Sequence, residues 1–380
     1  MKFILAPDSF KECMTAKEAC IAMEKGIKRI MPGAICVHVP LADGGEGTLH
    51  TMVALTGGNI FQQKVKDPLG NETAGEYGIL GDNETGVVEL ASASGLHLVD
   101  VDKRNPLITT TYGTGELIKA ALAHGIKKLV IGIGGSATND GGAGIAQALG
   151  VKFLDKDGNE IGFGGGELNK IESIDTSGLI AIDKDVEIEV ACDVTNPLTG
   201  KNGAAYIYGP QKGATKEMVE VLDRNLEHYT EKIKVYLYKD VKDMEGAGAA
   251  GGAGAGLMAF LNAKKVRGID IILKYYNLEE KIKDADYIFT GEGSIDHQVA
   301  FGKTISGVID LAKKYNKPVI AFAGNVEDAD ALYKLGITSV FGILPSVSTL
   351  KEALEGAKEN LENTVYAVTK LIGFATGSSH

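Results

Sequence analysis

Five segments of the sequence combine glycine and other small residues with a few polar side chains, a composition suited to binding an anion. Each one follows a predicted strand or opens a predicted helix; they are residues 6–16, 42–48, 132–144, 192–200 and 290–298. Glycine after a strand lets backbone N–H groups approach an anion, and the N-terminus of the following helix adds partial positive charge. A tight turn explains any one segment alone, but five together favour a ligand site.

The same segments contain five aspartates: Asp8, Asp43, Asp140, Asp193 and Asp296. Acidic side chains among loops that hold an anion indicate a phosphate group with its magnesium ion. Asp8 and Asp43 each follow an N-terminal strand, so we predict that they bind magnesium directly or through water. The alternative for each aspartate is that it caps the helix that follows.

The P-loop is one phosphate-binding motif that the sequence lacks. Gly302-Lys303-Thr304 matches the end of GxxxxGK[ST], but the first glycine of the motif would stand where the chain has His297. Lys303 is still a candidate for neutralising phosphate charge at the start of a helix. The alternative for Lys303 is a solvated surface lysine.

The stretch from Gly132 to Ala137 matches a second motif, the GxGxxA of dinucleotide-binding proteins. A predicted helix over 141–149 and a predicted strand over 151–154 follow, and Asp155 stands near the place of a ribose-binding acid. This spacing makes an NAD-dependent oxidoreductase acting on a hydroxy acid the alternative function. Against it, the TNDGG stretch after Ala137 is polar and flexible where the helix of that fold should already be running.

The elements that would position these loops are those of an α/β protein. Apolar runs rich in Val and Ile alternate with amphipathic helical stretches, which predicts a largely parallel sheet. The chain begins with a strand over 3–6, a helix that Thr15 and Glu18 open as a capping box, and a strand over 35–41. Between residues 59 and 94, short strands joined by turn signals are more typical of a mixed sheet.

We therefore predict two domains. Strands and helices alternate again after residue 284, so residues 1–58 and 281–374 are expected to form a discontinuous Rossmann-like (flavodoxin-like) domain with a doubly wound, mostly parallel sheet. Residues 59–280 are expected to form an inserted second α/β domain with a mixed sheet. Residues 375–380 are mostly small and polar, and we expect them to be the remnant of a tag.

The most biased stretch is GAGAAGGAGAGL at residues 246–257. Such a composition is typical of a flexible linker. However, the stretch contains no serine and leads directly into the apolar residues 257–261. A closely packed helix that lets another backbone approach is therefore an equally good interpretation.

Composition excludes several classes of protein. With 39 basic and 50 acidic residues, the 380-residue chain has a net charge of −11, whereas a protein that binds nucleic-acid backbones needs a basic excess. No apolar run approaches the roughly 18–20 residues of a membrane-spanning helix, and the apolar start before Pro7 is too short for a secretory signal. Four cysteines without a CxxC pair and scattered histidines disfavour a disulfide framework and a zinc site. We expect a cytoplasmic protein with no membrane and no nucleic-acid partner.

Eight segments carry a resemblance to a known family: APDSFKECMTA (6–16), PLADGGEGT (40–48), RNPLITTTYGTGELI (104–118), GIGGSATNDGG (132–142), CDVTNPLTG (192–200), GPQKGAT (209–215), GAGAAGGAGAGL (246–257) and TGEGSID (290–296). On these segments the chain resembles the bacterial type-1 glycerate kinase family. The resemblance extends from Lys2 to about Ile372. The chain departs from the family pattern at Thr195, where an acid or amide is commoner, and around residues 297–301.

The resemblance implies a two-domain α/β protein with the active site in the interdomain cleft. It also implies Mg-assisted, in-line transfer of a phosphoryl group from ATP to (R)-glycerate, with 2-phosphoglycerate as the product. ATP and Mg2+ are the expected cofactors, glycerate is the expected substrate, and a homodimer is left open. A catalytically silent sensor of sugar acids is a further alternative, which the retained aspartates disfavour because a sensor needs no metal site.

In-line transfer requires an acceptor for the proton of the attacking hydroxyl group. We predict Asp296 as this base, because it follows a strand-to-helix glycine turn at residues 291–293 whose amides could stabilise the transferring group. Asp193 is the second candidate for the base. Lys11, in the first loop, is expected at the same catalytic centre.

The carboxylate of glycerate requires a cation or several N–H donors. Arg104 is the first candidate for this contact, and Lys11 and Lys212 are alternatives. The predicted substrate-binding residues are Ser9, Arg104, Asn196 and Lys212, and the predicted nucleotide-binding residues are Gly134, Gly135, Ser136, Thr138, Asn139, Gly291, Gly293 and Lys303.

Overall fold

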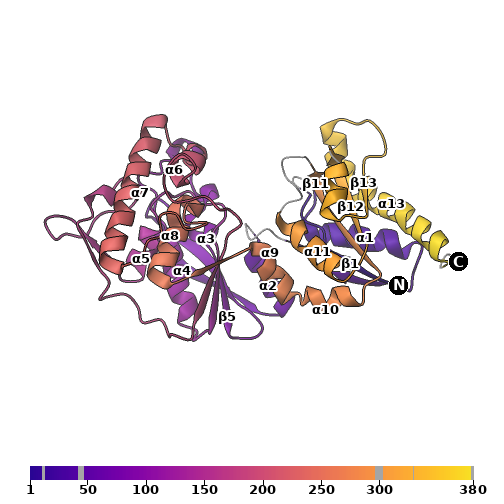
Figure 1. The fold of residues 1–380 in the computed structure, drawn as a ribbon, viewed down its shortest axis with the longest axis horizontal. Coiled ribbons are helices and arrows are strands. Elements are labelled where there is room, and N and C mark those ends of the chain that lie inside the picture. The colour runs from indigo at the N-terminus through magenta and orange to yellow at the C-terminus, as the bar shows by residue number, and fades with distance from the viewer. Residues whose placement is uncertain (11–12, 42–46, 296–302, 328, 378–380) are drawn as a thin grey trace. The chain divides into compact units, whose positions relative to one another are not determined.

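The chain folds into two compact units. The computed structural model describes residues 1–10, 13–41, 47–295, 303–327 and 329–377 (Figure 1). Unit 1 comprises Met1–Asp43 and Ile269–His380, and unit 2 comprises Gly44–Gly268. The sequence places the divisions later, at 58/59 and 280/281. No helix among the described residues has the length and apolar character needed to cross a membrane.

Two helices explain why the boundaries of the units differ from the predicted domain boundaries. Helix α2 (Thr48–Thr56) packs within unit 2, where a Cβ atom at Gly78 would lie 2.5 Å from the side chain of Val53. Helix α9 (Gly268–Tyr275) packs within unit 1, where a Cβ atom at Gly307 would lie 2.9 Å from the side chain of Ile269. Each helix therefore belongs to the unit whose glycine lets it approach closely.

Unit 1 is built on a parallel sheet of five strands. Their order is β2 (Ile35–His38), β1 (Lys2–Leu5), β11 (Tyr287–Ile295), β12 (Val319–Val326) and β13 (Ser339–Gly342). Counted along this unit alone, the order is 2-1-3-4-5, which is that of flavodoxin-like sheets. The predicted parallel sheet is confirmed, and its topological switch point lies between β1 and β11.

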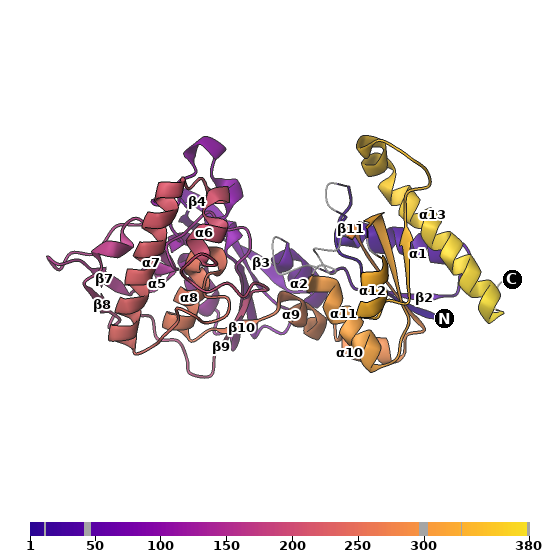
Figure 2. The same ribbon diagram turned by 45° about the horizontal axis from the view of Figure 1, so that its top comes forward.

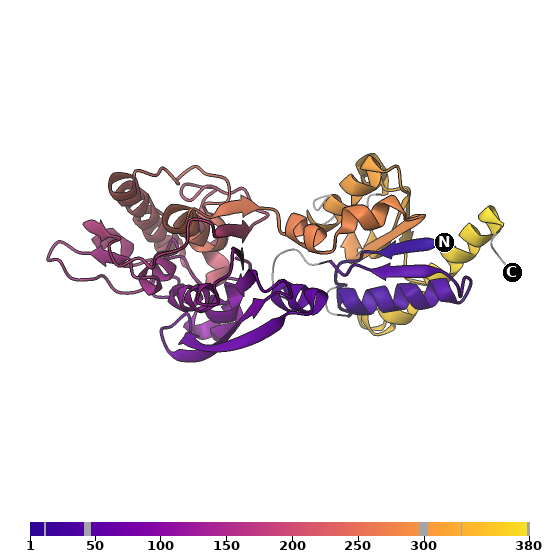
Figure 3. The same ribbon diagram turned by 90° about the horizontal axis from the view of Figure 1, so that it is seen from below.

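Helices cover both faces of this sheet, as a doubly wound fold requires. Helices α1 (Ala16–Lys28) and α13 (Leu350–Thr376) lie side by side on one face (Figure 2), and their core includes Phe3, Phe289 and Phe322. Figure 3 shows α10 (Leu278–Lys283), α11 (Lys303–Lys314) and α12 (Ala329–Leu335) on the opposite side of the strands from α1; α9 also belongs to this unit.

The N-terminus of α1 is the predicted capping box. The backbone N–H of Glu18 donates to Thr15 Oγ1 over 3.2 Å, and the backbone N–H of Thr15 donates to Glu18 Oε2 over 3.0 Å. The two bonds satisfy donors that the first helical turn leaves without a partner. Helix α13 continues to Thr376, so it includes the first two of residues 375–380.

Unit 2 contains a mixed sheet of six strands, as predicted for the middle of the chain. The order is β3 (Asn59–Lys66), β4 (Glu72–Ile79), β5 (Thr85–Glu89), β6 (Lys128–Gly132), β9 (Glu187–Ala191) and β10 (Lys264–Val266). Strands β3, β4 and β5 pair antiparallel, whereas β5, β6, β9 and β10 pair parallel. The parallel half therefore brings the carboxyl ends of four strands to one edge.

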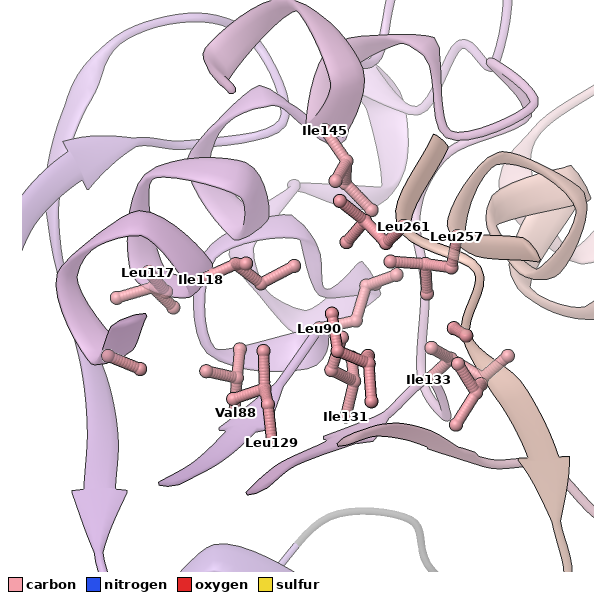
Figure 4. Close-up of a cluster of buried hydrophobic side chains, with 14 of the residues drawn as sticks. Val88, Leu90, Leu117, Ile118, Leu129, Ile131, Ile133, Ile145, Leu257 and Leu261 are labelled. Atoms are coloured by element: carbon pink, nitrogen blue, oxygen red, sulfur yellow. The ribbon is translucent and has the colours of Figure 1, made fainter. Parts of the chain in front are cut away.

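Helices of unit 2 pack on this sheet around an aliphatic core (Figure 4). The sheet contributes four inward-pointing side chains to this core: Val88, Leu90, Leu129 and Ile131. They point toward Leu117, Ile145 and Leu257, which come from three different helices. The helices and 3₁₀ turns of the unit are α3 (Ala91–Ser94), α4 (Tyr112–Leu122), α5 (Ala143–Ala148), α6 (Ala204–Tyr208), α7 (Lys216–Leu237), α8 (Ala249–Leu261), Leu96–Leu98, Val101–Lys103, Leu168–Lys170 and Pro210–Lys212.

The dinucleotide-binding alternative is wrong, because its strand–helix–strand unit does not form. After β6, helix α5 spans only six residues, and the next strand, β7 (Lys152–Leu154), pairs antiparallel with β8 (Ser173–Asp175) in a separate ribbon. Strand β6 is flanked by β5 and β9 instead. The carboxylate of Asp155 accepts hydrogen bonds from the amides of Asp157 and Asn159, both at 2.9 Å, so it closes a turn where a ribose contact was considered.

The glycine-rich stretch 246–257 is a buried part of unit 2 and not a linker. It enters α8, which is kinked because Ala250, Gly251 and Gly252 have left-handed φ angles of 53°, 69° and 90°. A Cβ atom at Gly251 would lie 1.9 Å from the carbonyl oxygen of Thr138. Only glycine can combine this backbone conformation with so close an approach.

Replacement of Gly251 by alanine tests this packing. Gly125→Ala is the matched control, because Gly125 has nearly the same φ angle of 70° but no atom within 4 Å of its Cβ position. The control should lose about 1–2 kcal/mol of unfolding free energy through backbone strain alone. Gly251→Ala should lose about 3 kcal/mol more, because the methyl group displaces the Thr138 carbonyl. Urea denaturation measures both; equal losses would contradict the close packing.

Candidate nucleotide site and its buried support

The loop after β6 (residues 133–142) is the best-formed candidate for binding phosphate in unit 2. Two bonds attach it to the loop after β5: Leu96 N–H donates to the Gly135 carbonyl over 2.8 Å, and Ala137 N–H donates to the Ser94 carbonyl over 2.9 Å. Gly135 is exposed with a φ angle of 71°, and Gly134 is half-buried. Within the described residues, the backbone amides of Gly134 and Gly135 have no recorded hydrogen-bond acceptor. These amides lie at the carboxyl edge of the parallel strands, where ligands bind in α/β sheets.

Asp140 holds the second half of this loop from the protein interior. Its side chain is 1% exposed. Its carboxylate accepts hydrogen bonds from the amide and hydroxyl of Thr111 (2.8 and 2.9 Å) and from the amides of Gly142 and Gly144 (3.1 and 3.3 Å). Burial raises the pKa of Asp140, and these donors oppose that rise. Asp140 is therefore a structural anchor of the loop.

Lys212 holds the first half of the loop in a similar way. The side chain is 2% exposed, and its Nζ donates to Ser136 Oγ over 2.7 Å and to the Thr138 carbonyl over 2.6 Å. Burial lowers the pKa of Lys212 to about 7, although the charge of Asp140 acts in the opposite direction. The structure thus brings Lys212 together with two predicted nucleotide-binding residues; its predicted contact with the substrate carboxylate is not tested.

The buried position of Lys212 makes stability depend on pH. The folded pKa of about 7 lies below the ordinary value of 10.5, so unfolding takes up a proton between these values. The wild type should therefore gain unfolding free energy relative to Lys212→Met as the pH rises from 7 to 9, by about 1 kcal/mol per pH unit. Chemical denaturation of both proteins across this range measures the gain. Parallel stability curves would show that Lys212 keeps its ordinary pKa in the fold.

Two further residues of the loop point inward. Thr138 and Asn139 are fully buried, and within the described residues Thr138 Oγ1 and both polar atoms of the Asn139 amide lack a hydrogen-bond partner. A Cβ atom at Gly251 would lie 2.7 Å from the Cα atom of Asn139, which places the α8 kink beside these groups. Their side chains face the protein interior in this structure, so their predicted contact with a nucleotide stays a prediction.

The loop after β9 carries Asp193 and Asn196. Asp193 Oδ1 accepts the Gly268 amide over 3.2 Å, and the side chain is half-buried. The Asn196 side chain donates to the Asn202 carbonyl over 2.8 Å and accepts from the Tyr208 hydroxyl over 2.7 Å. Both amide atoms of Asn196 thus stabilise its own loop, and the proposed substrate contact remains untested.

Arg104 lies beside the loop that carries Lys212. A Cβ atom at Gly213, whose φ angle is 89°, would lie 2.4 Å from the carbonyl oxygen of Arg104. The guanidinium Nε is 3.4 Å from the Val99 carbonyl, and the side chain is half-buried. The structure therefore brings two predicted substrate-binding residues, Arg104 and Lys212, to neighbouring positions in the fold.

Unit 1 brings other candidates to its switch point. The Asp8 amide donates to the Gly291 carbonyl over 2.8 Å, and the Ser9 amide donates to Asp8 Oδ1 over 2.6 Å. Gly291 and Gly293 do not form the predicted strand-to-helix turn, because both lie inside β11, which stays paired with β12 up to Ile295. The predicted glycine turn is therefore wrong, and its residues continue β11 beside the loop after β1.

Several predicted site residues lie outside the described residues or lack a described side chain. Lys11, Asp43 and Asp296 belong to the first group, and Lys303 begins α11 without a described side chain. Within the described part of the chain, no three His, Cys, Asp or Glu side chains come together as metal ligands. Of the two predicted metal ligands, Asp8 lies within the described residues, and a single carboxylate suits a magnesium ion that completes its shell with phosphate oxygens and water.

Comparisons with known proteins identify the family of the chain. Residues 3–373 match the family described as the glycerate kinase family. The chain is 52% identical to a glycerate kinase of Bacillus subtilis (strain 168), over 99% of this chain and 98% of that one, and 54% identical to a glycerate 2-kinase of Escherichia coli (strain K12), over 95% of each. A crystal structure reported as that of a candidate glycerate kinase 2 from Salmonella typhimurium LT2 matches with a TM-score of 0.90 and 47% identity, over 99% of both chains. The chain belongs to the glycerate kinase family.

Membership of the glycerate kinase family confirms the resemblance and the enzyme class, a kinase, that the eight segments predict. Two polar residues beside the candidate loops, Glu89 and Thr111, are not among the residues that the sequence predicts for the site. Glu89 ends β5 in register with Gly132, and its Oε1 accepts the Leu49 amide over 2.8 Å at the N-terminus of α2. Burial raises the pKa of Glu89. Thr111, the Asp140 partner, ends a run of threonines within segment 104–118, and the place of that run in a family-like segment was the available signal.

Proposed function

We propose that the protein transfers the γ-phosphoryl group of ATP to (R)-glycerate and forms 2-phosphoglycerate. The observation that carries this proposal is identity of about half of all positions to glycerate kinases, one named a glycerate 2-kinase, over nearly the whole chain. The amides of Gly134 and Gly135 in the loop after β6 support it, because backbone N–H groups at the end of a parallel strand suit a phosphate. The missing dinucleotide-binding unit counts against the oxidoreductase alternative.

The candidate site residues would have the following roles in phosphoryl transfer. The amides of Gly134 and Gly135 would bind phosphate oxygens, and their fixed geometry would favour the charge that develops during transfer. Asp296 would accept the proton of the attacking hydroxyl group of glycerate, with Asp193 as the second candidate. Magnesium, when bound, would neutralise phosphate charge; Asp8 and Asp43 would hold it. ATP and Mg2+ are thus the proposed cofactors.

The substrate carboxylate would be held by a cation at the edge of the site. Arg104 is the better-supported candidate, because its side chain is half-buried whereas the amino group of Lys212 is enclosed by the loop it holds. Lys11, Ser9 and Asn196 remain candidates for the same substrate. A guanidinium group can form two parallel hydrogen bonds with a carboxylate, which would also orient the reacting hydroxyl group.

The reaction itself is tested by incubation with ATP, Mg2+ and each glycerate enantiomer, followed by phosphorus NMR. We expect ADP and a phosphate ester on the 2-hydroxyl group of the (R) enantiomer. An ester at the 3-hydroxyl group would overturn the proposed product. Binding of glycerate without consumption of ATP would favour the silent sensor, and a change in nicotinamide absorbance would favour the oxidoreductase.

The assignment of the base predicts the effect of Asp296→Asn. The amide cannot accept the hydroxyl proton, so kcat should fall by about 100-fold or more. Asp330→Asn, which changes an exposed aspartate at the first turn of α12, is the control and should keep wild-type turnover. If Asp296→Asn retains turnover within about tenfold while Asp193→Asn does not, the base is Asp193.

A further inference from the structure

Lys212 is a lysine with an unusual position, beneath a loop and almost without contact with solvent. Lysine is rarely buried, because removing an ammonium group from water is unfavourable unless it finds partners. Here Nζ finds two neutral acceptors, Ser136 Oγ at 2.7 Å and the Thr138 carbonyl at 2.6 Å. The recorded partners of the Asp140 carboxylate are Thr111, Gly142 and Gly144, so Lys212 and Asp140 act on different parts of the loop.

The two acceptors of Lys212 lie close in the sequence to the amides of Gly134 and Gly135. Ser136 directly follows Gly134 and Gly135, so the bond to its hydroxyl group anchors the end of the exposed turn. The Thr138 carbonyl, two residues later, is the same oxygen against which Gly251 packs. Without the amino group, both oxygens would face a buried space with one partner fewer. The turn at Gly134 and Gly135 would then lose the two hydrogen bonds that fix the residues directly after it.

We propose that Lys212 is a positioning residue, whose buried amino group holds Ser136 and Thr138 so that the amides of Gly134 and Gly135 are presented to the nucleotide phosphates. This inference rests on the proposed use of a nucleotide. It assigns Lys212 to the nucleotide and not to the substrate carboxylate. Since the side chain would not touch either ligand, its removal should weaken nucleotide binding while leaving the glycerate contacts intact.

The surroundings of Lys212 agree with a geometric role. Asp140 acts on it from the loop, Tyr229 of α7 lies near Asp140, and the backbone of Arg104 packs behind Gly213. A neutral amine retains two N–H groups, and two acceptors are recorded. The support would therefore persist in either protonation state. The side chain of Lys212 is 2% exposed, so the amino group has almost no contact with solvent.

The test compares Lys212→Met, which keeps the unbranched chain as far as the position of Lys Cε but has no donor, with Lys212→Gln, which keeps two N–H groups. Lys216→Met, four residues later at the exposed start of α7, is the matched control. Calorimetry with a non-hydrolysable ATP analogue should show nucleotide binding weakened by about tenfold in the methionine variant. The KM for ATP should rise to a similar degree while the KM for glycerate stays near wild type. The glutamine variant should recover part of the loss.

Hydrogen exchange of the unliganded proteins provides a readout that does not depend on activity. Peptides covering residues 132–144 should exchange faster in Lys212→Met and at the wild-type rate in Lys216→Met. If the methionine variant fails to fold, Ser136→Ala removes one acceptor without changing the lysine and should show the same effects to a smaller degree.

Three outcomes would overturn the inference. The first is a methionine variant with nucleotide affinity within about twofold of wild type and unchanged exchange of the loop. The second is a rise in the KM for glycerate alone, which would return Lys212 to the substrate. The third is a glutamine variant as impaired as the methionine variant. If the wild type binds nucleotide but does not phosphorylate glycerate, the proposed function fails while the affinity comparison still decides the role of Lys212.

Discussion

Backbone-to-backbone contact between two glycine-rich stretches is the constraint on which the candidate nucleotide site depends. Residues 138–142 and 250–256 approach so closely that the Gly141 amide donates to the Gly251 carbonyl over 3.0 Å. A Cβ atom at Gly256 would lie 2.6 Å from the Gly141 carbonyl oxygen. This contact leaves no room for side chains, and it determines where the loop after β6 can run.

Buried polar groups complete the support that the glycine contact begins. Asp140 and Lys212 are both removed from water, which is unfavourable unless each group is hydrogen-bonded. Asp140 has four recorded donors and Lys212 has two recorded acceptors, all in or beside the loop. Such groups add little net stability, but they specify one conformation of the loop. A site that must present amides to a phosphate needs that rigidity.

Each unit places its polar loops at the carboxyl ends of parallel strands. In unit 1 this is the switch point between β1 and β11, where the Asp8 amide bonds to the Gly291 carbonyl. In unit 2 it is the edge formed by β5, β6 and β9, which carries Gly134, Gly135 and Asp193. The same rule of sheet geometry therefore explains both sets of candidates.

The sequence by itself determined the α/β class, the mixed sheet in the middle of the chain, the capping box at Thr15 and the family, because these depend on local periodicity and on short ordered motifs. Only the tertiary structure decided that Gly291 and Gly293 lie in a strand, that β7 leaves the sheet of β6, and that Lys212 is buried. Strand pairing and burial depend on partners distant along the chain. Strand β11 pairs with β12, and β6 pairs with β9. Lys212 donates a hydrogen bond to Ser136, which lies 76 positions earlier in the chain. Local patterns contain no information about such partners, so chemistry that depends on burial becomes visible only in the fold.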